Sequence, residues 1–226
     1  MSRHLLLDLA AIVTPSHTAL VAIDMQNDFC ADDGYTRKIT RRDVSTCQAV
    51  VEPITRLAAG AGRAGVPIVW VKADYDPRHL PAPILAKRQA SGKDIPYCVA
   101  GTWGAEFYGV APDPGDLVVT KHRHSAFRGT ELDNLLRDRR IESLVIVGVQ
   151  THVCVESTLR DASAHGYYVV VPRDCVGSHT PDLHEATLKS VQMHFGEVTT
   201  SAELVRIWSA GHVPESTPAL RQTPAR

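Results

Sequence analysis

Short apolar runs recur along this chain, and most are rich in Val, Ile, Leu or Ala. Runs of this length that end in Gly, Pro or a charged residue are typical of β-strands. The run Leu144–Val147 is continuously apolar, which favours a strand covered on both faces of its sheet. The expected strands are Ala19–Ile23, Pro67–Val71, Leu117–Thr120, Leu144–Val147, Tyr167–Val171 and Glu197–Thr200.

Segments compatible with helices separate these runs. In one of them, Asp182 and Glu185 occupy the first turn, where acidic side chains favour a helix start. The expected helices are Ser45–Gly62, Thr130–Arg139, Cys154–His165, Pro181–Phe195 and Ser201–Ala210. Alternating strands and helices predict an α/β fold, with three α/β/α layers around a mainly parallel, Rossmann-like central sheet of about six strands.

The length of 226 residues fits one compact domain. We expect a single domain over residues 1–226, with a core over about 18–208 and a flexible tail over 211–226. The stretch Asp74–Trp103 is rich in Pro, Gly and charge, and a short helix is expected within it at Ile84–Gln89. A loop this long is usually functional, so we expect it to border an active site or an interface. A surface insertion without a role is the alternative.

The charge balance excludes some classes of partner. The chain has 24 basic and 25 acidic residues, which argues against a nucleic acid or an anionic membrane as the main partner. No apolar run approaches the ~20 residues that a membrane span needs, and Leu5–Leu7 followed by Asp8 makes a poor signal peptide. Five cysteines without paired spacing do not suggest disulfides. We therefore expect a cytoplasmic protein.

One cysteine lies where a nucleophile is expected. Cys154 follows the strand Leu144–Val147 and sits at or just inside a helix N-terminus. Backbone N–H groups and the helix dipole favour a thiolate there. A small apolar cysteine packed under the sheet is the alternative, and this stretch alone does not separate the two readings.

Two charged residues follow other strands. Asp24 directly ends the strand Ala19–Ile23, and Lys121 ends Leu117–Thr120. Open α/β sheets bind ligands at the carboxyl ends of their strands, so both side chains are expected to enter the crevice beside Cys154. A carboxylate that accepts the thiol proton and an ammonium that stabilises the thiolate make chemical sense together. A turn-capping aspartate and a solvated rim lysine are the alternatives.

Three motifs then make a specific resemblance. They are Val21–Phe29, then Lys121 with Ser125–Leu132, then Val147–Val155. In this order they resemble the isochorismatase-like cysteine hydrolase family, over about residues 18–208. Within it, Gly34–Tyr35 and Val153–Asp161 resemble ureide amidases such as ureidoacrylate amidohydrolases and biuret hydrolases.

The resemblance implies a catalytic triad of Asp24, Lys121 and Cys154. It implies a non-proline cis peptide bond at Val149–Gln150 and an oxyanion hole formed by the N–H groups of Gln150 and Cys154. The implied reaction is hydrolysis of a C–N bond in a small amide or ureide, through an acyl-thioester on Cys154. It involves no cofactor, and relatives of this kind are commonly dimers or tetramers.

Other side chains are candidates for substrate contact. The aromatic ones are Phe29, Tyr35, Trp103 and Phe127. The polar ones, suited to a carboxylate or a carbonyl-rich substrate, are His122, Arg123, His124 and His152. Each is equally compatible with structural packing.

A metal site is not expected. The resembled nicotinamidases carry Asp-x-His and a later His, whereas this chain has Asp76 two residues after Asp74. This departure argues against a nicotinamidase metal site and substrate, while a hard cation on Asp74 and Asp76 stays open. A lactam-opening enzyme like streptothricin hydrolase is the main alternative function. Isochorismatases lack a cysteine at the position that matches Cys154, so this residue argues against isochorismatase activity. Intact Asp24, Lys121 and Cys154 argue against a non-catalytic binding protein.

Overall fold

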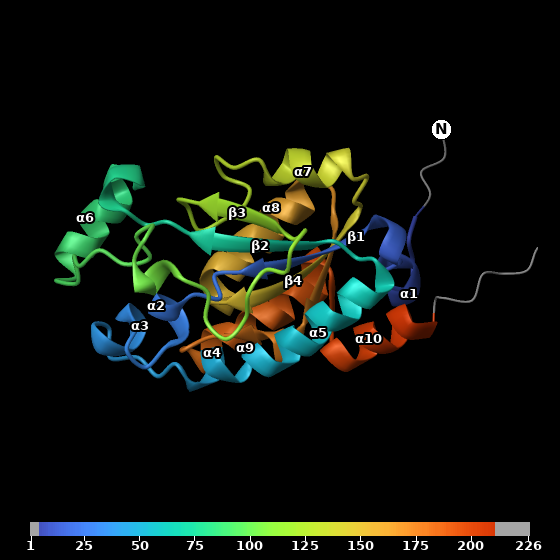
Figure 1. Ribbon diagram of the computed structural model, residues 1–226, viewed down its shortest axis with the longest axis horizontal. Helices are drawn as coiled ribbons and strands as arrows, with labels where there is room; N and C mark the ends of the chain where they lie inside the picture. Colours follow the sequence, from blue (N-terminus) through green and yellow to red (C-terminus); the bar gives the residue numbers. More distant parts are fainter. Residues whose placement is uncertain (1–4, 211–226) are drawn as a thin grey trace, which may run out of the picture.

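The structure, a computed structural model, describes residues 5–210 and contains one central sheet of seven strands (Figure 1). The strands are β1 Thr18–Ile23, β2 Ile68–Ala73, β3 Leu117–Lys121, β4 Ser143–Val149, β5 Tyr168–Pro172, β6 Val176–Gly177 and β7 Glu197–Thr199. Their order is β3-β2-β1-β4-β5-β7, and β6 pairs with the carboxyl end of β4. All these pairings are parallel. The expected flexible tail, 211–226, lies outside the described residues.

All six predicted strands are confirmed, with ends that shift by one or two residues. The unpredicted strand β6 has only two residues, too few to produce a periodic pattern. The central strands β1 and β4 are buried along their whole length, as the apolar pattern of Leu144–Val147 indicated.

Helices cover both faces of the sheet, which confirms the three-layer architecture. Alternate residues of β1 enter two separate cores, Leu20 on one face and Val21 on the other. The helices α5 and α10 pack on the first face, and α7 and α8 lie on the second (Figure 1). The α-helices are α1 Leu9–Ile12, α2 Asn27–Cys30, α3 Tyr35–Lys38, α4 Ser45–Ala49, α5 Val51–Ala64, α6 Ala82–Ala90, α7 Leu132–Asp138, α8 Glu156–Ala164, α9 Pro181–Ser190 and α10 Ser201–Ala210.

Three predicted helices are interrupted. The segment expected over Ser45–Gly62 divides at Val50, because Pro53 has no N–H to donate to Ala49 in a continuous helix. The wide π-helical turns Thr151–Val155 and Val191–Phe195 adjoin α8 and α9, where one regular helix was expected in each case. Such turns are frequent at functional sites, and the first of them contains Cys154.

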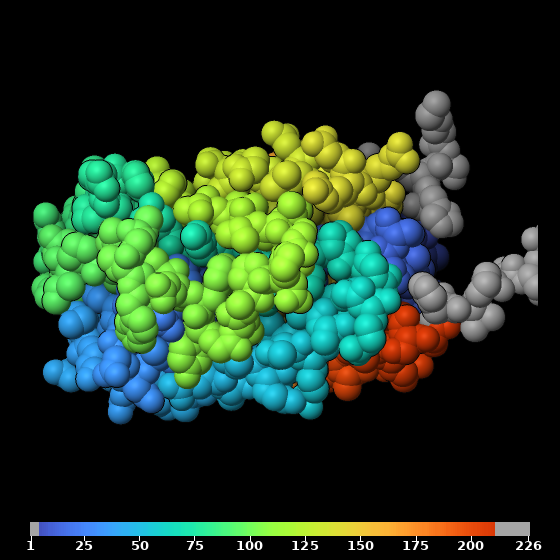
Figure 2. All heavy atoms as spheres, in the orientation of Figure 1, coloured from blue at the N-terminus to red at the C-terminus, as the bar shows by residue number. Residues whose placement is uncertain are grey.

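The carboxyl ends of the parallel strands meet at one edge of the sheet. The stretch Asp74–Trp103 extends beyond this edge and contains the 3₁₀ turn Pro77–His79 as well as α6, close to the predicted Ile84–Gln89 (Figure 1). In Figure 2 the green segment between α6 and β3 lies across the face in view. None of the helices within residues 5–210 has the length and apolar character that crossing a bilayer requires.

Gly148 permits a close approach of β4 and β1 at this edge. Its φ is +112°, and a Cβ there would overlap the carbonyl oxygen of Ile23. Glycine is therefore required at this position. The residues that follow the two strands, beginning with Asp24 and Gln150, thus start from closely apposed backbones.

Candidate active site

Asp24 directly follows β1 and is completely buried. Its φ of +52° is uncommon for a residue other than glycine, although Asp tolerates this region better than most. The Asp24 N–H donates to the carbonyl oxygen of Val71 at 2.9 Å. Next to it, the Gln26 side chain accepts from the N–H of Ala73 and donates to its carbonyl oxygen. These bonds hold the residues after β1 against the end of β2.

Lys121 ends β3 and reaches Asp24 across the intervening strand β2. Its ammonium nitrogen lies 2.8 Å from Oδ2 of Asp24, and both side chains are inaccessible to solvent. The two groups form a buried ion pair, and neither Asp24 oxygen has a partner of regular hydrogen-bond geometry among residues 5–210. The ammonium donates at 3.0 Å to the Tyr75 hydroxyl and to the carbonyl oxygen of Arg123.

Cys154 lies in the π-helical turn after β4, with only 4% of its surface exposed. Its sulfur is 3.6 Å from the Tyr75 hydroxyl and 3.9 Å from Nδ1 of His124. The Gln150 carbonyl accepts from the N–H groups of Val153 and Val155, on either side of the Cys154 amide. The bond Val149–Gln150 is cis, as the resemblance implied.

Burial dominates the electrostatics of this cluster. Desolvation raises the pKa of Asp24, although the Lys121 ammonium and the Cys154 thiol pull it down. Desolvation also raises the pKa of Cys154 to about 12, against the opposing attraction of Lys121. The Asp24 carboxylate and the Cys154 sulfur raise the pKa of Lys121, and this outweighs the effect of its own burial.

The resting thiol is therefore neutral. The sequence argument that the helix N-terminus and the lysine favour a thiolate is wrong for this resting state, because the cost of burying a charged sulfur is larger. Ionisation of Cys154 then has to be coupled to transfer of its proton to a nearby base.

A cavity of about 170 Å³ opens at Cys154. Its lining is Phe29, Tyr35, Thr36, Thr40, Arg42, Tyr75, Tyr97, His124, Gln150, Val153, Cys154 and His179. The aromatic rings form one wall, in which Tyr35 stacks on Tyr97 with 4.2 Å between ring centroids.

Of the eight residues proposed for substrate contact, Phe29, Tyr35 and His124 line this cavity. Trp103, His122 and Phe127 do not. Half of the Trp103 surface is exposed to solvent, and Phe127 belongs to the second core, where it stacks on the exposed ring of His165. The polar candidates divide in the same way. His124 lines the cavity, whereas His122 and Arg123 lie outside its lining.

His152 lies beside the cavity. Its Nδ1 is 2.8 Å from the Ser178 hydroxyl, and its ring packs edge-on against His179, which is part of the lining.

The sequence did not identify Tyr75 and Tyr97 as wall residues. Both belong to the stretch Asp74–Trp103, which therefore borders the cavity as expected. The Asp28 carboxylate fixes this wall in place, because it accepts hydrogen bonds from the N–H groups of Tyr35 and Cys98, which lie far apart in the sequence. The position of Tyr75 just after β2 was a usable signal, whereas no local pattern marks Thr36, Arg42 or His179.

Potential metal ligands also gather beside this site, although the sequence predicted none. Asp74, His79 and His122 each place a ligand atom within 4.8 Å of the other two. The pair left open from the sequence, Asp74 and Asp76, is not this group, since Asp76 is bound by the Arg78 guanidinium.

Comparison with known proteins supports the motif assignment. The isochorismatase domain family matches residues 18–203. The chain is 33% identical over 219 residues to ureidoacrylate amidohydrolase RutB of Methylobacterium radiotolerans, which covers 91% of this chain and 83% of that protein.

Solved structures also support the motif assignment. A cysteine hydrolase from Pseudomonas syringae pv. phaseolicola superposes with a TM-score of 0.79 at 25% identity, over 93% of this chain and 99% of that one. N-carbamoylsarcosine amidase from Thermoplasma acidophilum superposes with a TM-score of 0.64 at 27% identity, over 81% and 96%.

Proposed function

This chain belongs to the isochorismatase family, and we propose that it is an amidohydrolase that cleaves a C–N bond of a small amide or ureide through an acyl-thioester on Cys154. The observation that carries the proposal is the convergence of three strand ends. The buried carboxylate of Asp24, the ammonium of Lys121 and the thiol of Cys154 form one electrostatic cluster at the cavity. Ureidoacrylate amidohydrolase and N-carbamoylsarcosine amidase, by their names, act on compounds of this chemical class.

In the first step, Asp24 takes the proton of the neutral Cys154 thiol. Burial has raised the pKa of this carboxyl group, which makes it a better base than an exposed aspartate. The Lys121 ammonium holds the carboxylate in place and stabilises the sulfur as it becomes negative. Deferring ionisation until substrate is bound keeps an uncompensated thiolate out of the buried site.

The sulfur then attacks the substrate carbonyl carbon, a C–S bond forms, and the carbonyl π electrons move to oxygen. We assign the N–H groups of Gln150 and Cys154 as donors to this oxyanion. The position of the Cys154 amide, between two amides that bind the Gln150 carbonyl, supports that role. As the intermediate collapses, the C–N bond breaks and protonated Asp24 gives its proton to the departing amine or ammonia.

Water completes the cycle. Asp24, again a carboxylate, removes a proton from a water molecule that attacks the thioester carbon. The C–S bond breaks, the acid product leaves, and the sulfur recovers the proton from Asp24. None of these steps places a metal ion at the reacting atoms.

The cavity favours a short, planar substrate. Aromatic rings and a volume of about 170 Å³ suit a carbamoyl group with a small substituent better than a large lactam, which is the alternative function. Arg42 and His179 line the same cavity, and Arg42 Nη1 lies 2.8 Å from a ring nitrogen of His179. The guanidinium is suited to pair with a carboxylate on the substrate. Of the residues proposed from the sequence, we retain Phe29 and Tyr35 as substrate contacts, and we add Tyr97.

A screen of ammonia release tests the proposal. The panel comprises ureido acids, neutral ureides, primary amides, nicotinamide and lactams, assayed with wild type, Cys154→Ala and Cys175→Ala. Cys175 is a matched control because it is buried but does not line the cavity. We expect turnover of a ureide by wild type and the control, and none by Cys154→Ala. Equal turnover by Cys154→Ala would discard the mechanism, and turnover of lactams alone would establish the alternative substrate class. A cytoplasmic location and a dimeric or tetrameric assembly stay predictions.

A further inference from the structure

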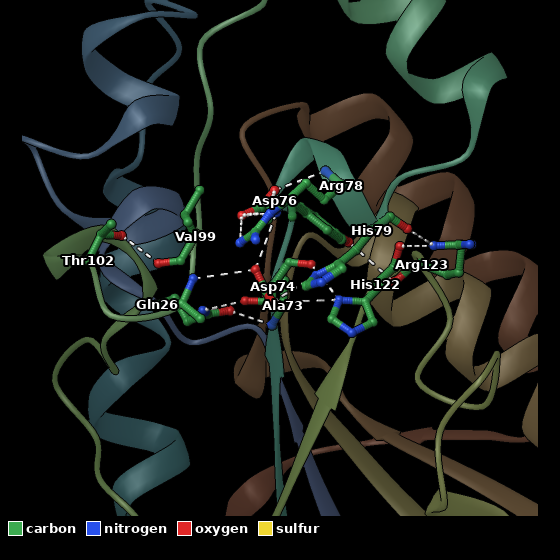
Figure 3. Close-up of polar contacts among 12 residues, drawn as sticks. Gln26, Ala73, Asp74, Asp76, Arg78, His79, Val99, Thr102, His122 and Arg123 are labelled. Carbon is green, nitrogen blue, oxygen red and sulfur yellow. Dashed lines mark hydrogen bonds and ion pairs between the residues drawn. The ribbon is translucent and has the colours of Figure 1, made fainter.

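Two imidazoles and one carboxylate meet on the outer side of the β2 and β3 ends. Nδ1 of His79 lies 3.0 Å from Oδ2 of Asp74, and Nδ1 of His122 lies 3.8 Å from the same oxygen. The two imidazole rings are 4.3 Å apart between centroids and are tilted by 52°. Figure 3 shows His79 and His122 to the right of Asp74, and Gln26 to its left.

These separations suit a shared ion. With ligand bonds of ~2.0–2.2 Å at tetrahedral angles, neighbouring ligand atoms lie ~3.3–3.5 Å apart. The two measured separations, 3.0 and 3.8 Å, lie on either side of that range. Two imidazoles and one carboxylate form a ligand set that binds zinc and related transition metals.

Neighbouring groups hold the ligands in place. Oδ1 of Asp74 accepts from the N–H groups of Asp76 and Ala100, which leaves Oδ2 directed at the histidines. Without an ion, Nδ1 of His122 lies 2.8 Å from the Asp74 carbonyl oxygen, and metal binding replaces this contact, because one ring nitrogen cannot both donate a proton and bind an ion. The Arg123 guanidinium binds the carbonyl oxygens of His79 and His122 and so ties the two ligand segments together.

The solvent access and the charge of these side chains are also compatible with metal binding. The Asp74 side chain is 9% exposed, whereas those of His79 and His122 are 40% and 35% exposed, so an ion has a route in and room for a water ligand. The nearby carboxylate of Asp76 is occupied by Arg78, both through its side chain and through the Arg78 N–H. Asp74 is thus the carboxylate of the group that faces both imidazoles.

We propose that one divalent transition-metal ion of the zinc class binds to Asp74, His79 and His122. This ion links the carboxyl ends of β2 and β3. This set shares Asp74 with the Asp-x-His pattern considered from the sequence but uses no residue at position 76, so the departure at Asp76 does not bear on it. Metal binding at this site does not depend on the proposed hydrolytic function. Its ligands adjoin Tyr75 and Lys121 in sequence, so the ion acts as a positioning element for these two side chains.

Metal binding by the whole chain tests the proposal. The protein is treated with a chelator, dialysed, and titrated with Zn²⁺ by calorimetry and by thermal unfolding. We expect one ion per chain and a Tm that rises with Zn²⁺ concentration. In His79→Gln and His122→Gln the affinity should fall by at least tenfold. The matched control is His165→Gln, because Nδ1 of His165 also faces a carboxylate, Oδ2 of Asp133, at 3.5 Å.

A thiol site has to be distinguished from this one. Cys154→Ala should bind Zn²⁺ as wild type does, and Co²⁺ bound to the wild-type chain should give visible d–d bands without a sulfur charge-transfer band. The Co²⁺ spectrum also keeps the proposal testable if a histidine variant fails to fold. Lack of stoichiometric binding, binding lost in Cys154→Ala, or unchanged affinity in both histidine variants would overturn the proposal.

Discussion

Replacement of Asp24 by Asn should destabilise the protein strongly, because it leaves the Lys121 ammonium buried without a counter-charge. The two groups are 2.8 Å apart, and their side chains are 0% and 1% exposed. At an effective dielectric constant of about 20, two unit charges at this distance attract by about 6 kcal/mol. Breaking one side of a buried pair costs roughly 3–5 kcal/mol in practice. We expect Asp24→Asn to lower the free energy of unfolding by that amount at pH 7.

Urea denaturation at pH 7 measures this loss, and thermal unfolding gives a second readout. For a chain of this size, each kcal/mol corresponds to roughly 2–4 °C in Tm, so the fall should be about 6–20 °C. The double variant Asp24→Asn/Lys121→Met should recover most of the stability, because apolar groups of similar volume often replace a buried ion pair without loss. It should not recover activity. A single Asn variant as stable as wild type, or a double variant no more stable than the single one, would refute the interpretation of a buried ion pair.

Three further predictions concern the same cluster. In Lys121→Met the pKa of Asp24 should rise further above its usual 3.8, so stability should be highest at acidic pH and fall as pH rises through that pKa, as measured by urea unfolding at pH 5 and pH 8. The pKa of Cys154 is about 12 against a usual 9.0, so its thiolate population at pH 7 is about a thousandfold smaller than that of an ordinary thiol. Iodoacetamide should therefore label Cys154 slowly in the free protein. Labelling as fast as that of glutathione would contradict this prediction. His124 is the other group near the sulfur that has the chemistry of a base, but His124→Asn should keep activity within about tenfold of wild type, whereas Asp24→Asn should lose about 10²–10⁴-fold, as expected for loss of the general base.

Much of the fold was predictable because its signals are local. The apolar runs of β1 and β4 are continuous in sequence, and each of the residues Asp24 and Lys121 directly follows such a run. Parallel pairing then brings strand ends together at one edge, so the convergence of the cluster follows from topology. The ionisation state of Cys154 was not predictable in this way, because it depends on how completely the surrounding chain excludes water.

The cavity wall and the metal ligands depend on contacts between distant segments. Tyr97 faces Tyr35 because Asp28 ties their two loops together, and no periodic pattern encodes such a bond. His79 and His122 are 43 positions apart and meet only through the pairing of β2 with β3. A search for closely spaced ligand motifs therefore could not find them.

Detection of the covalent intermediate tests the central claim most directly. The ureide with the fastest turnover in the ammonia-release screen is mixed with the protein, the reaction is stopped with acid within milliseconds to seconds, and the intact mass and the peptide that contains Cys154 are measured. We predict an adduct of the mass of the acyl fragment on Cys154, which appears and decays during turnover and is absent from Cys154→Ala. Full turnover by the wild-type protein without any adduct, or full activity in Cys154→Ala, would contradict the account.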